Sequence, residues 1–142
     1  MKVRSGLIAT LVMLCGCTTT PIDSSKTTRL PAEQLLKPEL VAKRASEPTT
    51  QVPVLFIRDA GFYGGGCLHE IYINDEPVLK LGTSESIQLY LPVGRTRFRN
   101  EIGGIVCPIF STAAETDLKD KDLLTVRTGT NEGRPFIRLE RK

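Results

Sequence analysis

The most reactive side chains in this 142-residue chain belong to four cysteines and one histidine. Cys15 and Cys17 stand together near the N-terminus, whereas Cys67 and Cys107 lie 40 residues apart. Thiolates serve as nucleophiles, metal ligands or disulfide partners, and their spacing separates these uses. No two cysteines form a C-x-x-C pair, and His69 is the sole histidine, so a metal or redox site is disfavoured. The sequence favours a structural or surface role for His69.

Carboxylates are the other candidates for chemistry. Asp75-Glu76 and the pair Asp120 and Asp122 sit in evident turns, where solvation by water explains their presence. A glycosidase-like pair of carboxylates is therefore not supported by the sequence, although it is not excluded. The sequence predicts no catalytic residue, no metal and no cofactor.

The two N-terminal cysteines close an apolar run. Lys2 and Arg4 precede Gly6–Leu14, which has the length of a secretory h-region and falls short of the roughly 20 apolar residues that span a bilayer. The run ends in Leu14-Cys15-Gly16-Cys17, with a small residue directly before the last cysteine. This segment resembles the lipobox of bacterial lipoproteins.

The lipobox resemblance implies a signal peptide over residues 1–16 and a diacylglyceryl and acyl (palmitate-type) modification of Cys17. Cys15 would leave with the signal. Thr18 stands where an aspartate would retain a lipoprotein at the inner membrane, so the resemblance implies the outer membrane, with the domain facing the periplasm. An ordinary cleaved signal and an unprocessed N-terminus remain alternatives. Two or more acyl chains make a stable membrane anchor, whereas one chain holds a protein only marginally.

Composition leaves room for one domain and a tail. Loss of Lys2 and Arg4 with the signal leaves 17 of the 19 basic side chains against 16 acidic ones, a formal net charge of +1. This balance gives no indication of nucleic-acid binding. The low aromatic content of 6% and the absence of tryptophan predict a modest core.

Residues 17–51 have the composition of a lipidated, flexible tether. They are rich in Thr, Ser, Pro, Lys and Glu, and such a stretch buries too little apolar surface to fold alone. As a free coil the tether would reach about 30 to 35 Å. Within it, Pro31–Leu36 predicts a helix of one or two turns that ends before Pro38. Leu35, Leu36, Leu40 and Val41 are expected to dock on the domain or on a partner.

Residues 52–142 predict a single small β-sandwich of about seven strands, because short apolar runs alternate with turn signals at intervals near ten residues. No helical period persists beyond about one turn. The last loop is expected at Gly129–Arg134 and a turn at Asn74–Pro77. The expected strands are Val52–Arg58, Leu68–Asn74, Val78–Leu81, Ser86–Leu91, Arg95–Glu101, Ile109–Glu115, Leu123–Thr128 and Pro135–Leu139.

The stretch Ile71–Phe98 has a strand, an Asn74-Asp75 turn, a short strand and then Leu89-Tyr-Leu-Pro-Val-Gly94 leading into another strand. This pattern resembles the PEGA-type and related β-sandwich modules of bacterial envelope lipoproteins. The resemblance covers about thirty residues, most of them in turns. It implies a fold and a compartment, and no activity.

After processing, Cys67 and Cys107 are the two cysteines without lipid. An even pair in an oxidising compartment predicts a disulfide. The bond would close a loop of about 40 residues and stabilise the domain by roughly 4 kcal/mol. A small domain with a modest core depends on such a crosslink.

Two further features are possible partner contacts. The glycine-rich stretch Asp59–Gly66 carries Phe62 and Tyr63 but lacks the Gly-Lys-Ser/Thr of a phosphate-binding loop, so it is a plain connection or a loop that presents two aromatic side chains.

Arg95, Arg97 and Arg99 lie two residues apart and therefore share one face of a strand. This arginine stripe would bind an anionic polymer, a lipid phosphate or an acidic partner. The alternative is a solvated face neutralised by acids on neighbouring strands, such as Glu70, Glu85 or Asp117.

These features predict an outer-membrane lipoprotein that acts as a non-catalytic binding or structural module of the cell envelope, with an envelope protein as its partner. An immunity, inhibitor or exclusion lipoprotein is the first alternative. An accessory subunit of a secretion or conjugation apparatus is the second, and it shares every one of these physical features.

Overall fold

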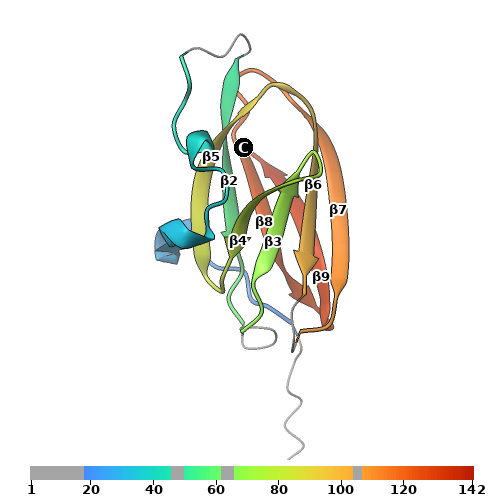
Figure 1. Cartoon of the computed structure of the whole chain (residues 1–142). Coiled ribbons are helices and arrows are strands. Elements are labelled where there is room, and N and C mark those ends of the chain that lie inside the picture. The colour runs from blue at the N-terminus through green and yellow to red at the C-terminus, as the bar shows by residue number, and fades with distance from the viewer. Residues whose placement is uncertain (1–17, 46–49, 62–65, 104–106) are drawn as a thin grey trace, which may run out of the picture.

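A computed structural model describes residues 18–45, 50–61, 66–103 and 107–142 of the chain. In these ranges nine strands form two β-sheets that face each other, which confirms the predicted all-β sandwich (Figure 1). The strands are β1 (Thr28–Arg29), β2 (Gln51–Arg58), β3 (His69–Ile73), β4 (Glu76–Leu81), β5 (Glu85–Pro92), β6 (Gly94–Ile102), β7 (Phe110–Leu118), β8 (Leu124–Asn131) and β9 (Arg134–Arg141).

One sheet has the strand order β1-β5-β2-β8-β9 and the other has the order β4-β3-β6-β7. Neighbouring strands are antiparallel except for β1 with β5 and β2 with β8. The eight strands expected from the sequence correspond to β2 through β9. The two-residue strand β1 was not expected, because it comes from the segment interpreted as a tether.

Alternating burial along the strands produces the core, as the sequence pattern predicted. Ile87, Leu89 and Leu91 of β5 are buried, whereas Gln88 between them is exposed. Apolar side chains from both sheets meet in the middle, where the rings of Phe56 and Phe98 pack edge to face with their centroids 5.8 Å apart. This contact joins the centres of the two sheets.

Two turns are tighter than the sequence suggested. Asn74 and Asp75 both adopt positive φ, so a two-residue turn suffices and β4 begins already at Glu76. The loop expected at Gly129–Arg134 is wrong in extent, because β8 continues to Asn131 and pairs there with Arg134. Only Glu132 and Gly133, with φ of 50° and 78°, form that turn.

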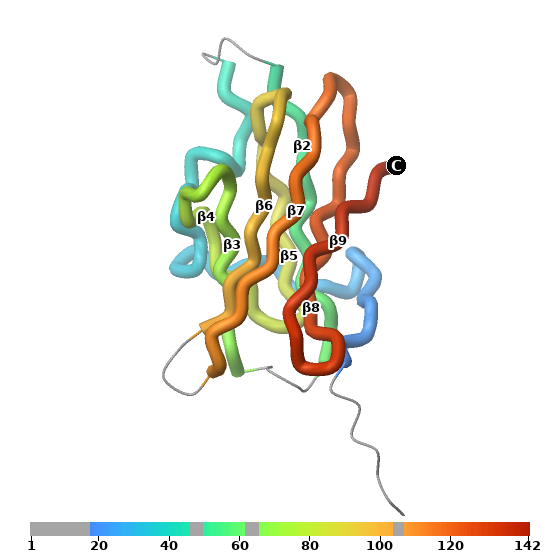
Figure 2. The backbone as a smooth tube through the Cα atoms, turned by 90° about the vertical axis from the view of Figure 1, so that its right-hand side faces the viewer, coloured from blue at the N-terminus to red at the C-terminus, as the bar shows by residue number. Residues whose placement is uncertain are grey.

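The flexible tether predicted for residues 17–51 is wrong for residues 18–45, which lie along the sandwich as an N-terminal strap (Figure 2). β1 pairs with β5, and Leu30 is buried in the core. Long-range hydrogen bonds and the burial of Leu30 stabilise the strap, and neither can be predicted from the local composition of residues 18–45. The folded unit therefore includes residues 18–45 and does not start at Val52.

Within Pro31–Leu36, where a helix of one or two turns was predicted, the structure has a single 3-10 turn at Ala32–Gln34, and another 3-10 turn follows at Pro38–Leu40. Leu35, Leu40 and Val41 pack on the core cluster, whereas Leu36 is exposed. The backbone N–H groups of Leu36 and Lys37 bond the Val78 carbonyl, so the strap covers the free edge of β4. The short helices are η1 (Ser24–Lys26), η2 (Ala32–Gln34) and η3 (Pro38–Leu40).

Candidate functional site

Three of the residues singled out from the sequence, Cys17, Phe62 and Tyr63, lie outside the described residues. The residues that follow Cys17 are described from Thr18 onward, so the contacts of Thr18 and Thr19 show where the chain next to Cys17 lies on the fold. The described ranges hold the N-terminal strap, the disulfide, several buried polar groups and the arginine stripe.

The first residues of the strap are fixed to the ends of β2 and β8. Thr19 is 7% exposed, and its N–H donates to the Thr130 carbonyl at 2.8 Å. Thr20 and Ala60 exchange two backbone hydrogen bonds of 2.6 and 3.0 Å. We call the site at the ends of β2 and β8 that holds Thr19 and Thr20 the seat of the strap. Gly129 leaves space for it, because a Cβ at position 129 would clash with the Thr19 hydroxyl and lie 2.8 Å from the Phe136 ring. The chain is thus held on the sandwich within two residues of Cys17.

A buried ion pair supports the same seat. Nη1 of Arg127 lies 2.6 Å from Oδ1 of Asp59, which is 1% exposed, and also donates to the Ile22 carbonyl at 3.0 Å. Nε of Arg127 faces Glu140 at 3.3 Å. Burial opposes the positive charge, but Asp59 and then Glu140 outweigh it, so the pKa of Arg127 lies above its ordinary value. One guanidinium therefore links the strap to β2, β8 and β9.

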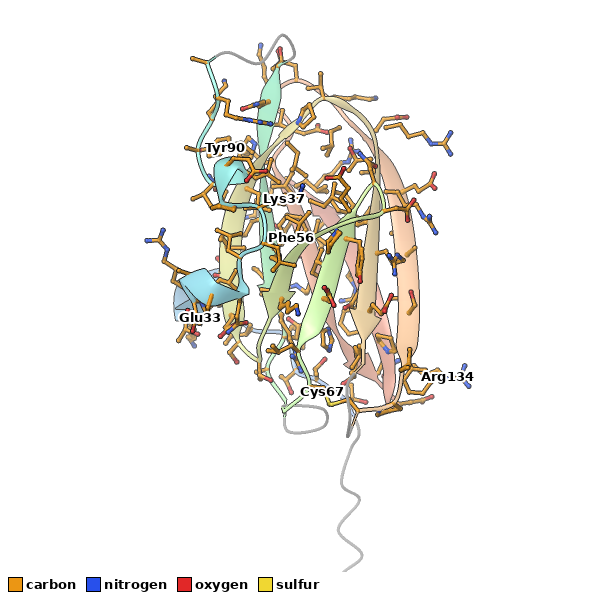
Figure 3. The ribbon with its side chains drawn as sticks, viewed as in Figure 1. Glu33, Lys37, Phe56, Cys67, Tyr90 and Arg134 are labelled. Atoms are coloured by element: carbon orange, nitrogen blue, oxygen red, sulfur yellow. A yellow bond between two sulfur atoms is a disulfide. The ribbon has the colours of Figure 1, made fainter. Side chains whose placement is uncertain are left out.

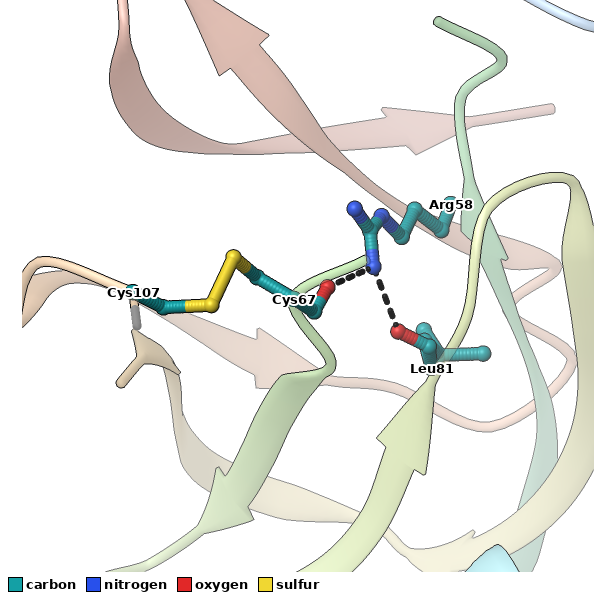
Figure 4. Close-up of a disulfide and its surroundings, with 4 residues drawn as sticks. All are labelled: Arg58, Cys67, Leu81 and Cys107. Carbon is teal, nitrogen blue, oxygen red and sulfur yellow. Dashed lines mark hydrogen bonds between the residues drawn. A yellow bond between two sulfur atoms is a disulfide. The ribbon is translucent and has the colours of Figure 1, made fainter. Parts of the chain in front are cut away.

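Cys67 and Cys107 form the predicted disulfide, which connects the start of β3 to the start of β7 (Figure 4). Beside it the buried Arg58 points its guanidinium at two backbone carbonyls, those of Cys67 and Leu81, the latter at 2.9 Å. Burial lowers the pKa of Arg58 to about 10, and it stays a cation at neutral pH. The disulfide thus fixes the Cys67 carbonyl, which accepts a hydrogen bond from the buried, positively charged guanidinium of Arg58.

His69 is completely buried and has a structural role, which is one of the two roles expected. Nδ2 of Asn100 donates to Nδ1 of His69 at 3.1 Å and to the Phe136 carbonyl at 3.3 Å. Because the amide nitrogen is the donor, Nδ1 accepts and the ring proton sits on Nε2. Burial first, and then the charge on Arg58, lower the pKa of His69 to about 3.

Between pH 6.5 and about 3 this histidine should destabilise the fold, because it is neutral when folded and protonated when unfolded. Stability is retained above pH 6.5 and lost as the pH falls towards 3. Between pH 7 and pH 4.5 the loss from this one group is about 2 to 3 kcal/mol. In urea unfolding, His69→Gln should lose that much less stability over this interval than the unmodified chain. Equal pH dependence in both proteins would contradict a buried neutral His69.

The arginine stripe lies on the outer face of β6 and is paired with acids. Arg95 bonds Glu115 at 2.6 Å, and Arg97 bonds Asp75 at 3.1 Å. Hydrogen bonding and attraction from Glu115 raise the pKa of Arg95. Arg99 pairs with Glu101 and covers the Tyr72 ring. The neutralised face expected as the alternative is what the structure shows. Of the acids named from the sequence, Asp117 lies directly across from Arg95 and its charge adds to the rise in the pKa of Arg95, whereas the ion pairs themselves are made by Glu115, Asp75 and Glu101.

Grooves run along the outer face of the five-stranded sheet. One of about 410 Å³ and one of about 180 Å³ share Leu55 and Gln88, with Tyr90 and Arg29 lining the larger. A third pocket, of about 440 Å³, lies between the strap and β9, where Asp59 and Phe136 line it. Neither shared groove contains a carboxylate, and in the third pocket Asp59 is held by Arg127. These grooves offer mixed polar and apolar contact surface.

The sequence interpretation missed the buried charges Arg58, Asp59 and Arg127. The sequence marks only the position of the first two, because Arg58-Asp59 ends an apolar run whose core-facing side chains are buried. Such a charged pair is typical of a strand that ends at the surface, and only the fold reveals that both side chains turn inward to distant partners.

No protein-family model, curated protein or solved structure matches the chain. Within the described ranges no helix is long and apolar enough to cross a bilayer. The same ranges contain no group of three or more His, Cys, Asp or Glu side chains that would hold a metal ion. Function is therefore inferred from the chain's own residues.

Proposed function

We propose that this chain is a lipoprotein of the bacterial outer membrane, anchored through acylated Cys17, whose sandwich faces the periplasm and acts by binding rather than by catalysis. The observation that carries the proposal is the seat of the strap: residues directly after the lipobox are fixed on the fold. A segment of this kind transmits the position of the lipid to the whole domain.

The disulfide supports the periplasmic part of the proposal. Disulfides persist in oxidising compartments such as the bacterial periplasm and are rare in the cytosol. Cys67 and Cys107 are bonded to each other, so Cys17 is left for the lipid once Cys15 leaves with the signal. The disulfide of Cys67 and Cys107 and the proposed lipid on Cys17 are both consistent with a protein located in the periplasm.

The distribution of buried charge supports binding over catalysis. Arg58, Asp59 and Arg127 contact backbone carbonyls or each other, and His69 contacts Asn100, so each has a structural task. A partner would meet the grooved outer face of the five-stranded sheet rather than a sheet edge. The strap covers β4, and Arg141 of β9 donates to the Asp117 carbonyl of β7 at 2.7 Å.

The test is a pair of cysteine variants in a Gram-negative host that expresses the full-length chain. Cys17→Ser should leave the membrane fraction or remain unprocessed, because the acyl chains supply the anchoring energy. Fractionation and immunoblotting measure both outcomes. Cys15→Ser is the matched control and should stay processed and membrane-bound, since Cys15 leaves with the signal. Processed, membrane-bound Cys17→Ser protein would contradict the proposal.

A further inference from the structure

Exposed apolar side chains gather at one end of the sandwich. Among the described residues, five large hydrophobic side chains are exposed, and three of them are Leu68, Ile109 and Phe110. Their exposed fractions are 41%, 77% and 40%. These three residues, which flank the disulfide, are named the apolar ridge. Single exposed leucines are common on protein surfaces, but a cluster marks a contact surface.

The pairing of strands brings the ridge together. Ile102 of β6 lies between His69 of β3 and Phe110 of β7 as their cross-strand partner. Adjacent strands are about 4.8 Å apart, so Leu68 and Ile109, one position further out, are separated by about two strand spacings. Ile109 leans into that interval, since a Cβ on Gly103 would lie 3.5 Å from its Cγ1. The ridge therefore lies across the ends of β3, β6 and β7 in the four-stranded sheet.

The ridge and the start of the described chain lie at the same end of the molecule. Thr18 bonds the side chain of Asn131, next to the β8–β9 turn. Figure 2 shows the start of the described chain, in blue, at the end where β3 begins and β8 ends, and Figure 3 shows Cys67 and Arg134 at that end. Leu123, another exposed leucine, precedes β8 and thus lies at the opposite end.

The attachment leaves little freedom between lipid and fold. The Cα atoms of Cys17 and Thr18 are about 3.8 Å apart across one peptide bond, and Thr19 is already buried. Acyl chains on Cys17 would therefore bring this end of the sandwich to the membrane surface. A free tether of about 34 residues would instead have allowed a separation of about 30 Å.

We propose that the apolar ridge of Leu68, Ile109 and Phe110 is a second membrane contact, which inserts into the lipid bilayer that holds the anchor and stands the sandwich end-on. This proposal rests on the lipidation of Cys17. Three side chains are too few to hold a protein on a membrane alone. Once the anchor makes the contact intramolecular, a weak interaction suffices. The expected depth is that of an interfacial segment, about 5 to 10 Å.

End-on standing has a consequence for the partner surface. The strands then run away from the membrane, and the groove along Leu55, Gln88 and Tyr90 opens sideways into the periplasm. The ridge thus orients the groove, while the acyl chains supply affinity.

The experiment uses the absence of tryptophan from the chain, which makes an introduced tryptophan the only one. Full-length Ile109→Trp and Leu123→Trp proteins, both at exposed sites, are purified from bacterial membranes and reconstituted into phosphatidylethanolamine–phosphatidylglycerol vesicles with and without lipid brominated on its acyl chains. Intact mass verifies acylation and the disulfide of each protein. Vesicle flotation measures membrane association.

The tryptophan of the Ile109→Trp protein should lose about half of its emission to the brominated lipid and shift to the blue, because an interfacial side chain reaches the upper acyl carbons. The tryptophan of the Leu123→Trp protein should show neither change. If both proteins are acylated and float with vesicles but their tryptophans respond alike, the ridge contact is overturned and the anchor stands. A protein that carries no acyl chains and does not float would overturn the proposed function, and the ridge contact with it.

Discussion

Replacing Cys67 and Cys107 together with serine is expected to lower the free energy of unfolding by about 4 kcal/mol, which is the chain-entropy value for a crosslink that closes a loop of this length. A domain of this size has about 5 to 15 kcal/mol in total, so the variant should be marginally stable. The disulfide also holds the Cys67 carbonyl against the guanidinium of Arg58. Urea unfolding followed by circular dichroism measures the change.

Reduction provides the control for this variant. A thiol reductant should lower the stability of the unmodified chain to that of the double serine variant, while the variant itself should not respond. A loss below about 1 kcal/mol in the variant would mean that the disulfide is not a main source of stability.

Removing the carboxylate of Asp59 is expected to cost about 3 to 5 kcal/mol, because Asp59→Ala leaves the mostly buried Arg127 without its closest counter-charge. Arg127 also holds the Ile22 carbonyl, so the strap should loosen. Urea unfolding measures the loss, and faster tryptic cleavage at Lys26 or Arg29 reports the loosened strap.

The matched control is Glu115→Ala, which removes a carboxylate on β7 that pairs with Arg95 on the exposed face of β6. An exposed pair contributes little because water screens its charges, so this variant should stay near the unmodified chain in stability and in tryptic cleavage. Equal losses from Asp59→Ala and Glu115→Ala would show that burial of the Asp59–Arg127 pair has no special effect.

Strand positions and the disulfide were predictable because their signals are local or countable. Ile87, Leu89 and Leu91 alternate with polar residues and face the core, as the pattern indicated. Cys67 and Cys107 were the two cysteines outside the N-terminal segment that resembles a lipobox, and they are bonded. The alternation is visible within six residues of sequence, and the cysteine pair follows from counting the cysteines, so neither prediction required knowledge of the fold.

The strap was not predictable, because its stabilising contacts join residues far apart in sequence. Thr19 bonds Thr130, and Arg127 gathers Ile22, Asp59 and Glu140. A composition rich in proline and polar residues indicates that a segment does not fold alone. It does not indicate whether the folded sandwich provides a surface on which the segment can pack. The composition was therefore interpreted as a free tether.

The arginine stripe was predicted in kind but not in detail. Alternation places Arg95, Arg97 and Arg99 on one face, and acids on neighbouring strands neutralise it, as one of the two interpretations held. Asp75 became a partner because the tight Asn74–Asp75 turn brings it beside β6, where the Asn74 side chain accepts from the Arg97 N–H at 2.9 Å. The pairing of Asp75 with Arg97 therefore depends on the geometry of the two-residue turn, and it could not be predicted because the sequence suggested a longer turn at Asn74–Pro77.

The most direct test of the proposed anchor is the intact mass of the protein purified from the membranes of an expressing bacterium. The proposal predicts a chain that starts at Cys17, carries a diacylglyceryl and an acyl group, and is two hydrogens lighter for the Cys67–Cys107 disulfide. An unmodified full-length chain would contradict the anchor, and with it the compartment and the end-on orientation.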